Sequence, residues 1–129
     1  MAETAETACV RKIRVFHCDD SRPFTRLCWF WLSAHADIEH VGEAHTLEAA
    51  LEAIAILRPE IVLLDTMGAP DDATALHQIR ARAPDARVVV LSGYVNLMPL
   101  AGDADAYVAK GDDDGPLLEA IRRVAGISP

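Results

Sequence analysis

The chain is poor in aromatic residues, cysteine and basic side chains. Of its 129 residues, 12 are Lys or Arg and 20 are Asp or Glu, which gives a formal net charge of -8. Because phosphate binding needs clustered Lys and Arg, this balance argues against a nucleic-acid surface on this chain alone. The cysteines, Cys9, Cys18 and Cys28, have neither CxxC spacing nor the density of a secreted disulfide scaffold. They indicate free thiols in a reducing cytosol and no zinc site.

Targeting and nucleotide-binding signals are also missing. The opening "MAETAETACV" lacks the cationic region and apolar run of a signal peptide, and no apolar run approaches the roughly 20 residues of a membrane span. Neither a GxGxxG nor a GxxxxGK[ST] loop is present. We therefore expect a cytoplasmic protein without membrane contact, with a flexible segment over 1-11, one folded domain over 12-126 and a tail over 127-129.

Short apolar runs alternate with amphipathic segments along the chain. The runs that predict strands are "IRVFHC" (13-18), "IEHVGEA" (38-44), "IVLLD" (61-65), "RVVVLS" (87-92) and "ADAYVAK" (104-110). The segments that predict helices are 21-36, 46-58, 72-82 and 115-126, with Ser21 and Thr46 as the first two N-caps. This alternation predicts an α/β fold, a parallel sheet with helices on both faces.

Polar residues end four of these predicted strands. Asp19 and Asp20 follow the first, Asp65 ends the third, Ser92 ends the fourth and Lys110 ends the fifth. In a parallel sheet these ends meet at the edge where ligands bind. Three carboxylates there would repel each other without a cation, and oxygen ligands favour Mg²⁺. With a lysine charge and a hydroxyl for phosphoryl oxygens, the set predicts phosphoryl transfer with Asp65 as the nucleophile.

Each of these residues also has a plainer interpretation when it is taken alone. Aspartate is a common turn residue, which would explain Asp65. The pair Asp19-Asp20 would suit the positive end of the following helix dipole. Lys110 and Ser92 would serve as a solvated lysine and a strand-end hydroxyl. The phosphoryl-transfer interpretation therefore depends on the group and not on any single member.

The same motifs, in this order, resemble the receiver domain of two-component response regulators. They are the acidic pair Asp19-Asp20, "IVLLDTM", "VVVLSGY" and "AYVAKG", and the resemblance covers roughly residues 12 to 125. Receivers of the NarL/LuxR class are the most similar. The resemblance implies a single doubly wound, flavodoxin-like sheet of five parallel strands in the order 2-1-3-4-5.

The resemblance also implies how the site works. Asp65 would take a phosphoryl group from a histidine kinase or a histidine phosphotransfer protein. Mg²⁺ would be held by Asp20, Asp65 and the backbone carbonyl of Met67, with Asp19 assisting through a water. The domain would be a signalling module that accepts and slowly loses its own phosphoryl group, and not an enzyme.

By the same resemblance, Ser92 and Tyr107 occupy the hydroxyl and aromatic switch positions. Their coupled movement would report phosphorylation to a distant surface, because the new charge enters an acidic pocket. For Tyr107, ordinary packing is the alternative. A homodimer is a further candidate assembly, and no nucleic acid is expected to bind this chain alone.

The sequence departs from the receiver pattern after Asp65 and before Lys110. Ala69 stands where the family usually has proline, and Asp72-Ala73 replaces the familiar Asp-Gly pair. The interval from Ser92 to Lys110 is about one helical turn shorter than expected and contains Pro99, which predicts a shortened or irregular fourth helix.

These departures leave two other functions open. A degenerate receiver would keep the fold as a phosphorylation-independent protein-interaction module. A Mg²⁺-dependent phosphohydrolase of the haloacid dehalogenase type would also use Asp65, but such enzymes carry a second aspartate where this chain has Met67.

The run "CWFWL" (28-32) raises a separate question. Five consecutive apolar residues cannot all lie on one helix stripe about 100° wide, so Trp29 or Phe30 is expected to be partly exposed. The exposed ring would either tuck under a neighbouring loop or belong to a docking surface for a kinase, a phosphotransfer protein or a second subunit.

Overall fold

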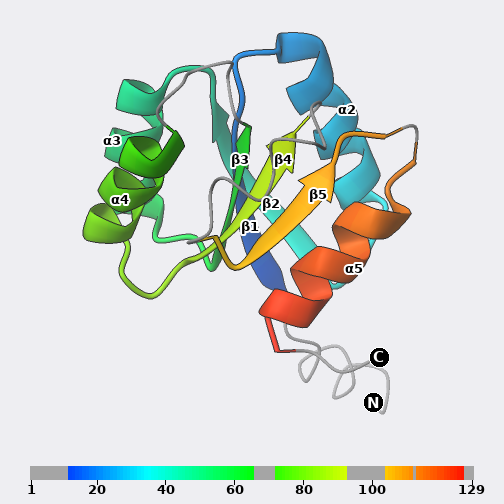
Figure 1. Ribbon diagram of the computed structural model, residues 1–129. Helices are drawn as coiled ribbons and strands as arrows, with labels where there is room; N and C mark the ends of the chain where they lie inside the picture. The colour runs from blue at the N-terminus through cyan, green and yellow to red at the C-terminus, as the bar shows by residue number, and fades with distance from the viewer. Residues whose placement is uncertain (1–11, 66–71, 93–103, 112, 127–129) are drawn as a thin grey trace.

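The computed structural model describes residues 12-65, 72-92, 104-111 and 113-126. They form a five-stranded sheet with helices on both faces (Figure 1). The strands are β1 (Ile13–Cys18), β2 (Ile38–Ala44), β3 (Ile61–Asp65), β4 (Arg87–Ser92) and β5 (Ala106–Ala109). The helices are α2 (Arg22–Ser33), α3 (Leu47–Leu57), α4 (Asp72–Arg82) and α5 (Gly115–Val124).

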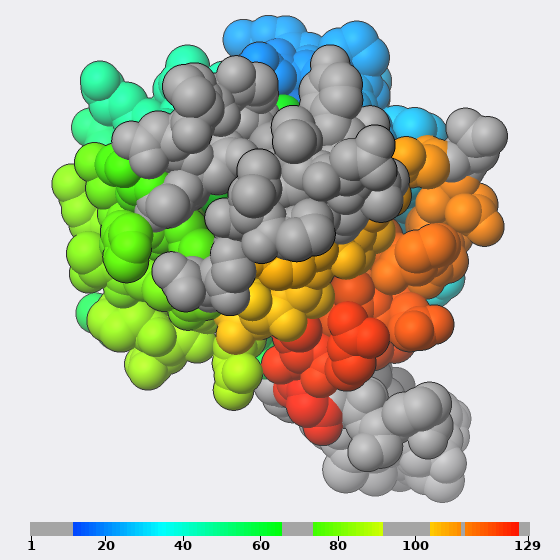
Figure 2. Space-filling view, in the orientation of Figure 1, coloured from blue at the N-terminus to red at the C-terminus, as the bar shows by residue number. Residues whose placement is uncertain are grey.

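Every pair of neighbouring strands is parallel, and the order is β2-β1-β3-β4-β5. The predicted doubly wound fold is therefore confirmed. Figure 1 shows α2 and α5 on one face of the sheet and α3 and α4 on the other. In the space-filling view, β5 reaches the surface between α4 and α5 (Figure 2).

The central strand β3 explains why the most apolar run of the chain is not amphipathic. Ile61 and Leu63 pack into the cluster under α2 and α5, whereas Val62 and Leu64 pack into the cluster under α3 and α4. Both sides of the strand are covered by helices, so each residue must be apolar until the strand reaches the sheet edge at Asp65. The position of the acid thus follows from the end of the covered region.

The predicted N-caps are confirmed. Ser21 Oγ accepts the Phe24 N–H at 3.3 Å, and Thr46 Oγ1 accepts the Ala49 N–H at 3.2 Å. The first helix ends at Ser33, earlier than predicted, because His35 N–H bonds to the carbonyl of Leu32 in a turn. β5 is likewise shorter than the predicted run over 104-110.

Several predictions fall outside the described residues. These are the segments 1-11 and 127-129, the altered loop after Asp65 and the shortened fourth helix between β4 and β5. Among the residues that the structure describes, no helix is long and apolar enough to cross a membrane.

The rings of Trp29 and Phe30 are both exposed, by 50% and 68%. The sequence prediction for this run is confirmed. Neither ring contributes to the core under α2, which Cys28 and Leu32 form.

Candidate functional site

The residues of the candidate site lie at the ends of three strands, at one edge of the sheet. Asp19 and Asp20 follow β1, Asp65 ends β3 and Lys110 follows β5. Asp19 is fixed by backbone contacts: its N–H donates to the carbonyl of Ala44 at 3.0 Å, and its Oδ1 accepts the Ser21 N–H at 2.8 Å. The first carboxylate is therefore tied both to β2 and to the start of α2.

The side chains converge as predicted. Lys110 Nζ lies 2.7 Å from Asp65 Oδ1 and 3.1 Å from Asp19 Oδ2. Carboxylate oxygens of Asp19, Asp20 and Asp65 lie within 4.8 Å of one another. Asp19 is fully buried and Asp65 nearly so, whereas Asp20 is exposed. Three carboxylates against one ammonium leave the cluster negatively charged, which suits a divalent cation.

The protonation states follow from these contacts. Burial alone would raise the pKa of Asp19, but His17, the Ser21 N–H and the Lys110 charge together hold it below its usual value. Burial would lower the pKa of Lys110, but hydrogen bonds and charges from Asp65 and Asp19 raise it. Asp19 therefore stays ionised and Lys110 stays protonated at neutral pH.

Two further residues, Phe24 and His17, support the site, and the sequence analysis assigns neither of them to it. Lys110 Nζ lies 4.4 Å from the centroid of the Phe24 ring, within range of a cation–π interaction. The edge of His17 meets the same ring at 5.9 Å, and His17 Nε2 lies 3.5 Å from Asp19 Oδ2. His17 is fully buried. Its position two residues before Asp19 was the available signal, because alternate strand residues share a face.

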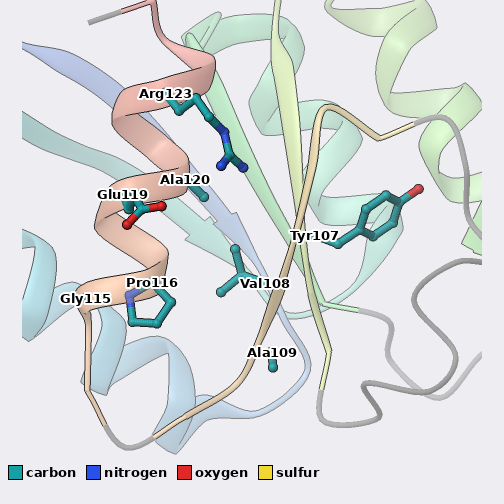
Figure 3. Close-up of a pocket in the computed structure, with 8 residues that line it drawn as sticks. All are labelled: Tyr107, Val108, Ala109, Gly115, Pro116, Glu119, Ala120 and Arg123. Carbon is teal, nitrogen blue, oxygen red and sulfur yellow. The ribbon is translucent and has the colours of Figure 1, made fainter. Parts of the chain in front are cut away.

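The predicted switch residues are described in part. Tyr107 is half-buried against the cluster under α3 and α4, and its hydroxyl accepts the Ala104 N–H at 3.3 Å. Figure 3 shows its ring pointing away from α5. Ser92 ends β4, but its side chain lies outside the described part of the structure, as does Met67.

A separate open pocket of about 550 Å³ lies between β5 and α5 (Figure 3). Val108 and Ala109 line it from the strand, and Pro116, Glu119 and Arg123 line it from the helix. None of the three aspartates lines it, so it is distinct from the carboxylate cluster.

Cys18 lies beside the carboxylates but is not suited to react. Burial, followed by the charges of Asp19, Asp65 and Asp20, raises the pKa of its thiol to about 12. The thiol therefore stays protonated at neutral pH, as expected of a small buried apolar residue.

Comparison with known proteins gives two kinds of relative. No family model matches the chain. The response regulator VraR of Staphylococcus saprophyticus is 29% identical over 116 residues, which are 86% of this chain and 56% of VraR. A protein-glutamate methylesterase/protein-glutamine glutaminase of a Nocardioides species is 33% identical over 119 residues, 87% of this chain and 32% of that protein. The chain thus spans about half of VraR and a third of the second relative.

Solved structures share the whole fold. The signal receiver domain of the response regulator NarL from Mycobacterium tuberculosis is 27% identical, with a TM-score of 0.77 over 90% of this chain and 98% of that one. The response regulator domain of Thermotoga maritima CheB is 25% identical, with a TM-score of 0.75 over 92% of this chain and all of that one. The predicted resemblance to response-regulator receivers, including those of the NarL/LuxR class, is confirmed in sequence and in fold.

Proposed function

We propose that this receiver domain accepts a phosphoryl group on Asp65 and passes the signal on by a change of conformation. The donor is a histidine kinase or a histidine phosphotransfer protein in the cytoplasm. One observation carries the proposal: Lys110 Nζ lies 2.7 Å from Asp65 Oδ1, at an edge where two further carboxylates gather. An acceptor carboxylate, a fixed positive charge and a cation site are what phosphoryl transfer requires of a protein.

An oxygen of the Asp65 carboxylate attacks phosphorus, and the phosphorus–nitrogen bond of the donor phosphohistidine breaks. The bonding electron pair leaves with the imidazole nitrogen, which takes a proton from water. An ionised carboxylate needs no general base. Lys110, already beside Asp65, supplies positive charge to the phosphoryl oxygens.

The acidic cluster fits Mg²⁺, since its oxygens lie within 4.8 Å of one another and its net charge is negative. We assign the ion to Asp20, Asp65 and the backbone carbonyl of Met67, with Asp19 assisting through a water. When bound, Mg²⁺ neutralises charge on the transferring group. The Ser21 N–H holds the carboxylate of Asp19 in place.

The switch follows from how Lys110 is shared. In the described structure this one ammonium contacts both Asp19 and Asp65. Phosphorylation replaces the single negative charge of the Asp65 carboxylate with about two on the phosphoryl group, so Lys110 and the hydroxyl of Ser92 turn toward it. Tyr107, whose hydroxyl bonds to the Ala104 N–H, then changes its packing and alters the surface between β4 and β5. The output is a protein contact and not turnover of a separate substrate.

The test is intact-mass spectrometry after incubation with acetyl phosphate, with Mg²⁺ or with chelator. The wild type is expected to gain one phosphoryl group only when Mg²⁺ is present, and Asp65→Asn is expected to gain none. Asp113→Asn, an exposed acid outside the cluster, is the matched control and is expected to behave as the wild type. Folded wild type that gains no phosphoryl group would contradict the proposal and favour the phosphorylation-independent interaction module.

A further inference from the structure

A polar cluster separate from the carboxylates lies between β2 and α2. It consists of His40 and Glu43 of β2 and of His45, which follows that strand. Glu43 is the central member: its Oε1 lies 4.0 Å from His40 Nε2, and its Oε2 lies 3.3 Å from His45 Nε2. We call these three residues the β2 triad. None of them belongs to the carboxylate cluster.

An irregularity in β2 brings the triad to one face of the sheet. Residues three apart on a regular strand point to opposite faces. Here the register with β1 shifts at Val41, so His40 and Glu43 pair with β1 residues that are only two positions apart and share a face. His45 joins them under α2, since its Nε2 lies 3.3 Å from Oγ1 of the buried Thr25.

His40 is the residue that points to a ligand. Its side chain is only 5% exposed, and its Nε2 makes no hydrogen bond with any residue that the structure describes. A buried nitrogen without a partner is rare in folded proteins. Burial holds the pKa of His40 below its usual value, so the ring is neutral at neutral pH.

The proton on the His40 ring is also placed. The ring hydrogen-bonds to the backbone carbonyl of His40 itself, and because Nε2 has no partner, Nδ1 makes this bond. Nε2 therefore presents a lone pair toward Glu43. Histidines that ligate metals typically donate their other ring N–H to a backbone carbonyl or a carboxylate in this way.

His45 and Glu43 supply the other two ligand atoms. The hydroxyl of Thr25 donates to the carbonyl of Arg22 at 2.9 Å, so it can accept a hydrogen bond from His45 Nε2 but cannot donate one to it. With its proton on Nδ1, His45 presents a second lone pair. The side chain of Glu43 is 34% exposed, which gives an ion a route in from solvent. Two imidazole nitrogens and a carboxylate oxygen are a donor set typical of zinc.

The distances show how far the triad has to move to hold an ion. With zinc–ligand bonds of about 2.0 to 2.1 Å, neighbouring ligand atoms of a tetrahedral site lie about 3.3 Å apart. The pair of His45 and Glu43 has this spacing, whereas that of His40 and Glu43 is longer. Among the described residues, only the carboxylate cluster has all three ligand atoms within 4.8 Å of one another. The triad therefore closes around its ion by rotation of Glu43 and His45, whose side chains are both partly exposed.

We propose that His40, Glu43 and His45 bind a divalent transition-metal ion of the zinc class, with water as the fourth ligand. The two sites then separate cations by their chemistry, because magnesium prefers oxygen ligands and zinc accepts imidazole nitrogen. The ion would fix both neighbours of Ala44, whose carbonyl accepts the Asp19 N–H at 3.0 Å. Zinc binding does not require phosphorylation, so it stands independently of the proposed function.

The test is zinc binding by isothermal titration calorimetry, with the untagged full chain in excess Mg²⁺ so that magnesium competes for the carboxylate cluster. The wild type is expected to bind one zinc ion with a Kd below about 10 µM. His45→Gln and Glu43→Gln change partly exposed positions, and His40→Gln keeps a polar side chain at the buried one. Each is expected to weaken binding about tenfold or more.

The matched control is His77→Gln, an exposed histidine of α4, which is expected to bind zinc as the wild type does. Asp20→Asn with Asp65→Asn removes two carboxylates of the other cluster and shows whether zinc uses that cluster instead. Thermal unfolding establishes that each variant is folded, and zinc is expected to raise the Tm of the wild type but not that of His45→Gln.

Three results would overturn the proposal. The first is a Kd for the wild type weaker than about 100 µM. The second is binding by all three triad variants as tight as that of the wild type. The third is zinc binding that is lost in Asp20→Asn with Asp65→Asn, which would assign the ion to the carboxylate cluster.

Discussion

Lys110 Nζ lies 2.7 Å from Oδ1 of Asp65, although the two residues come from strands that β4 separates. The contact exists because parallel strands end at one edge and the lysine side chain is long enough to reach across. The same ammonium lies 3.1 Å from Asp19 Oδ2. The ammonium of Lys110 therefore links Asp19, after β1, to the proposed acceptor Asp65 on β3.

Replacing Lys110 with methionine tests its role in transfer, because methionine keeps an apolar side chain against Phe24 while it removes the charge. We expect the rate of phosphorylation by acetyl phosphate to fall about 100-fold, as when one stabilising group of a reaction site is lost. The rate is measured by intact-mass spectrometry over time. Lys12→Met, at an exposed position, is the matched control. A rate for Lys110→Met within about threefold of the wild type would show that the lysine does not assist transfer.

Acid stability should report the state of Asp19. Its pKa in the folded protein lies below the ordinary value, so its stabilising contribution is fully present above about pH 4 and is lost as the pH falls through the folded-state pKa. We expect the free energy of unfolding of the wild type to fall more steeply than that of Asp19→Asn between about pH 5 and about pH 2. Urea unfolding in the presence of chelator measures both. Parallel curves would mean that His17, the Ser21 N–H and Lys110 do not favour the ionised carboxylate of Asp19.

The strand ends could be predicted from the sequence because they depend on local pattern. An apolar run followed by an acid, as at Asp65, marks the point where helices no longer cover the strand. Parallel topology then brings Asp65, Asp19 and Lys110 to one edge. The contact of Phe24 with Lys110 could not be predicted in this way, since it depends on the rotation of α2 against the sheet. The sequence pattern therefore identifies the residues of the site but not the side-chain contacts that hold them in place.

The ends of elements were less predictable for a related reason. The sequence pattern predicts a strand at Asp105, but its carboxylate accepts the Val88 N–H at 2.8 Å and its own N–H donates to the Val88 carbonyl. β5 therefore begins only at Ala106. Such contacts join residues far apart in the sequence, and the alternation of apolar and polar residues does not reveal them.

The buried thiols are expected to resist alkylation. Burial raises the pKa of both Cys18 and Cys28 to about 12. At about pH 8 only about one thiol in ten thousand is then ionised, and the thiolate is the reactive form. Treatment with iodoacetamide followed by peptide mass mapping should leave both residues unmodified in the native protein and modify them in urea. Rapid native modification of Cys18 would show that its thiol is open to solvent and reagent.

Arg122 ties α5 to the turn before β2. Its Nε and Nη2 lie 2.9 and 3.0 Å from Oδ2 and Oδ1 of Asp37, a two-pronged ion pair at a partly exposed position. We expect Arg122→Met to lower the free energy of unfolding by about 0.5 to 1 kcal/mol at low salt, and by less at high salt. Arg123→Met, the exposed neighbour, is the control. An equal loss in both variants would mean that the ion pair contributes nothing specific.

The central claim is that Asp65 forms the phosphoryl bond, and the most direct test is chemical identification of the modified residue. An acyl phosphate on aspartate is reduced by borohydride to homoserine, whose mass identifies its position by tandem mass spectrometry. After incubation with acetyl phosphate and Mg²⁺, we predict homoserine at position 65 and at no other aspartate. Homoserine at position 19 or 20 in place of 65, or none in protein shown to be folded, would contradict the account.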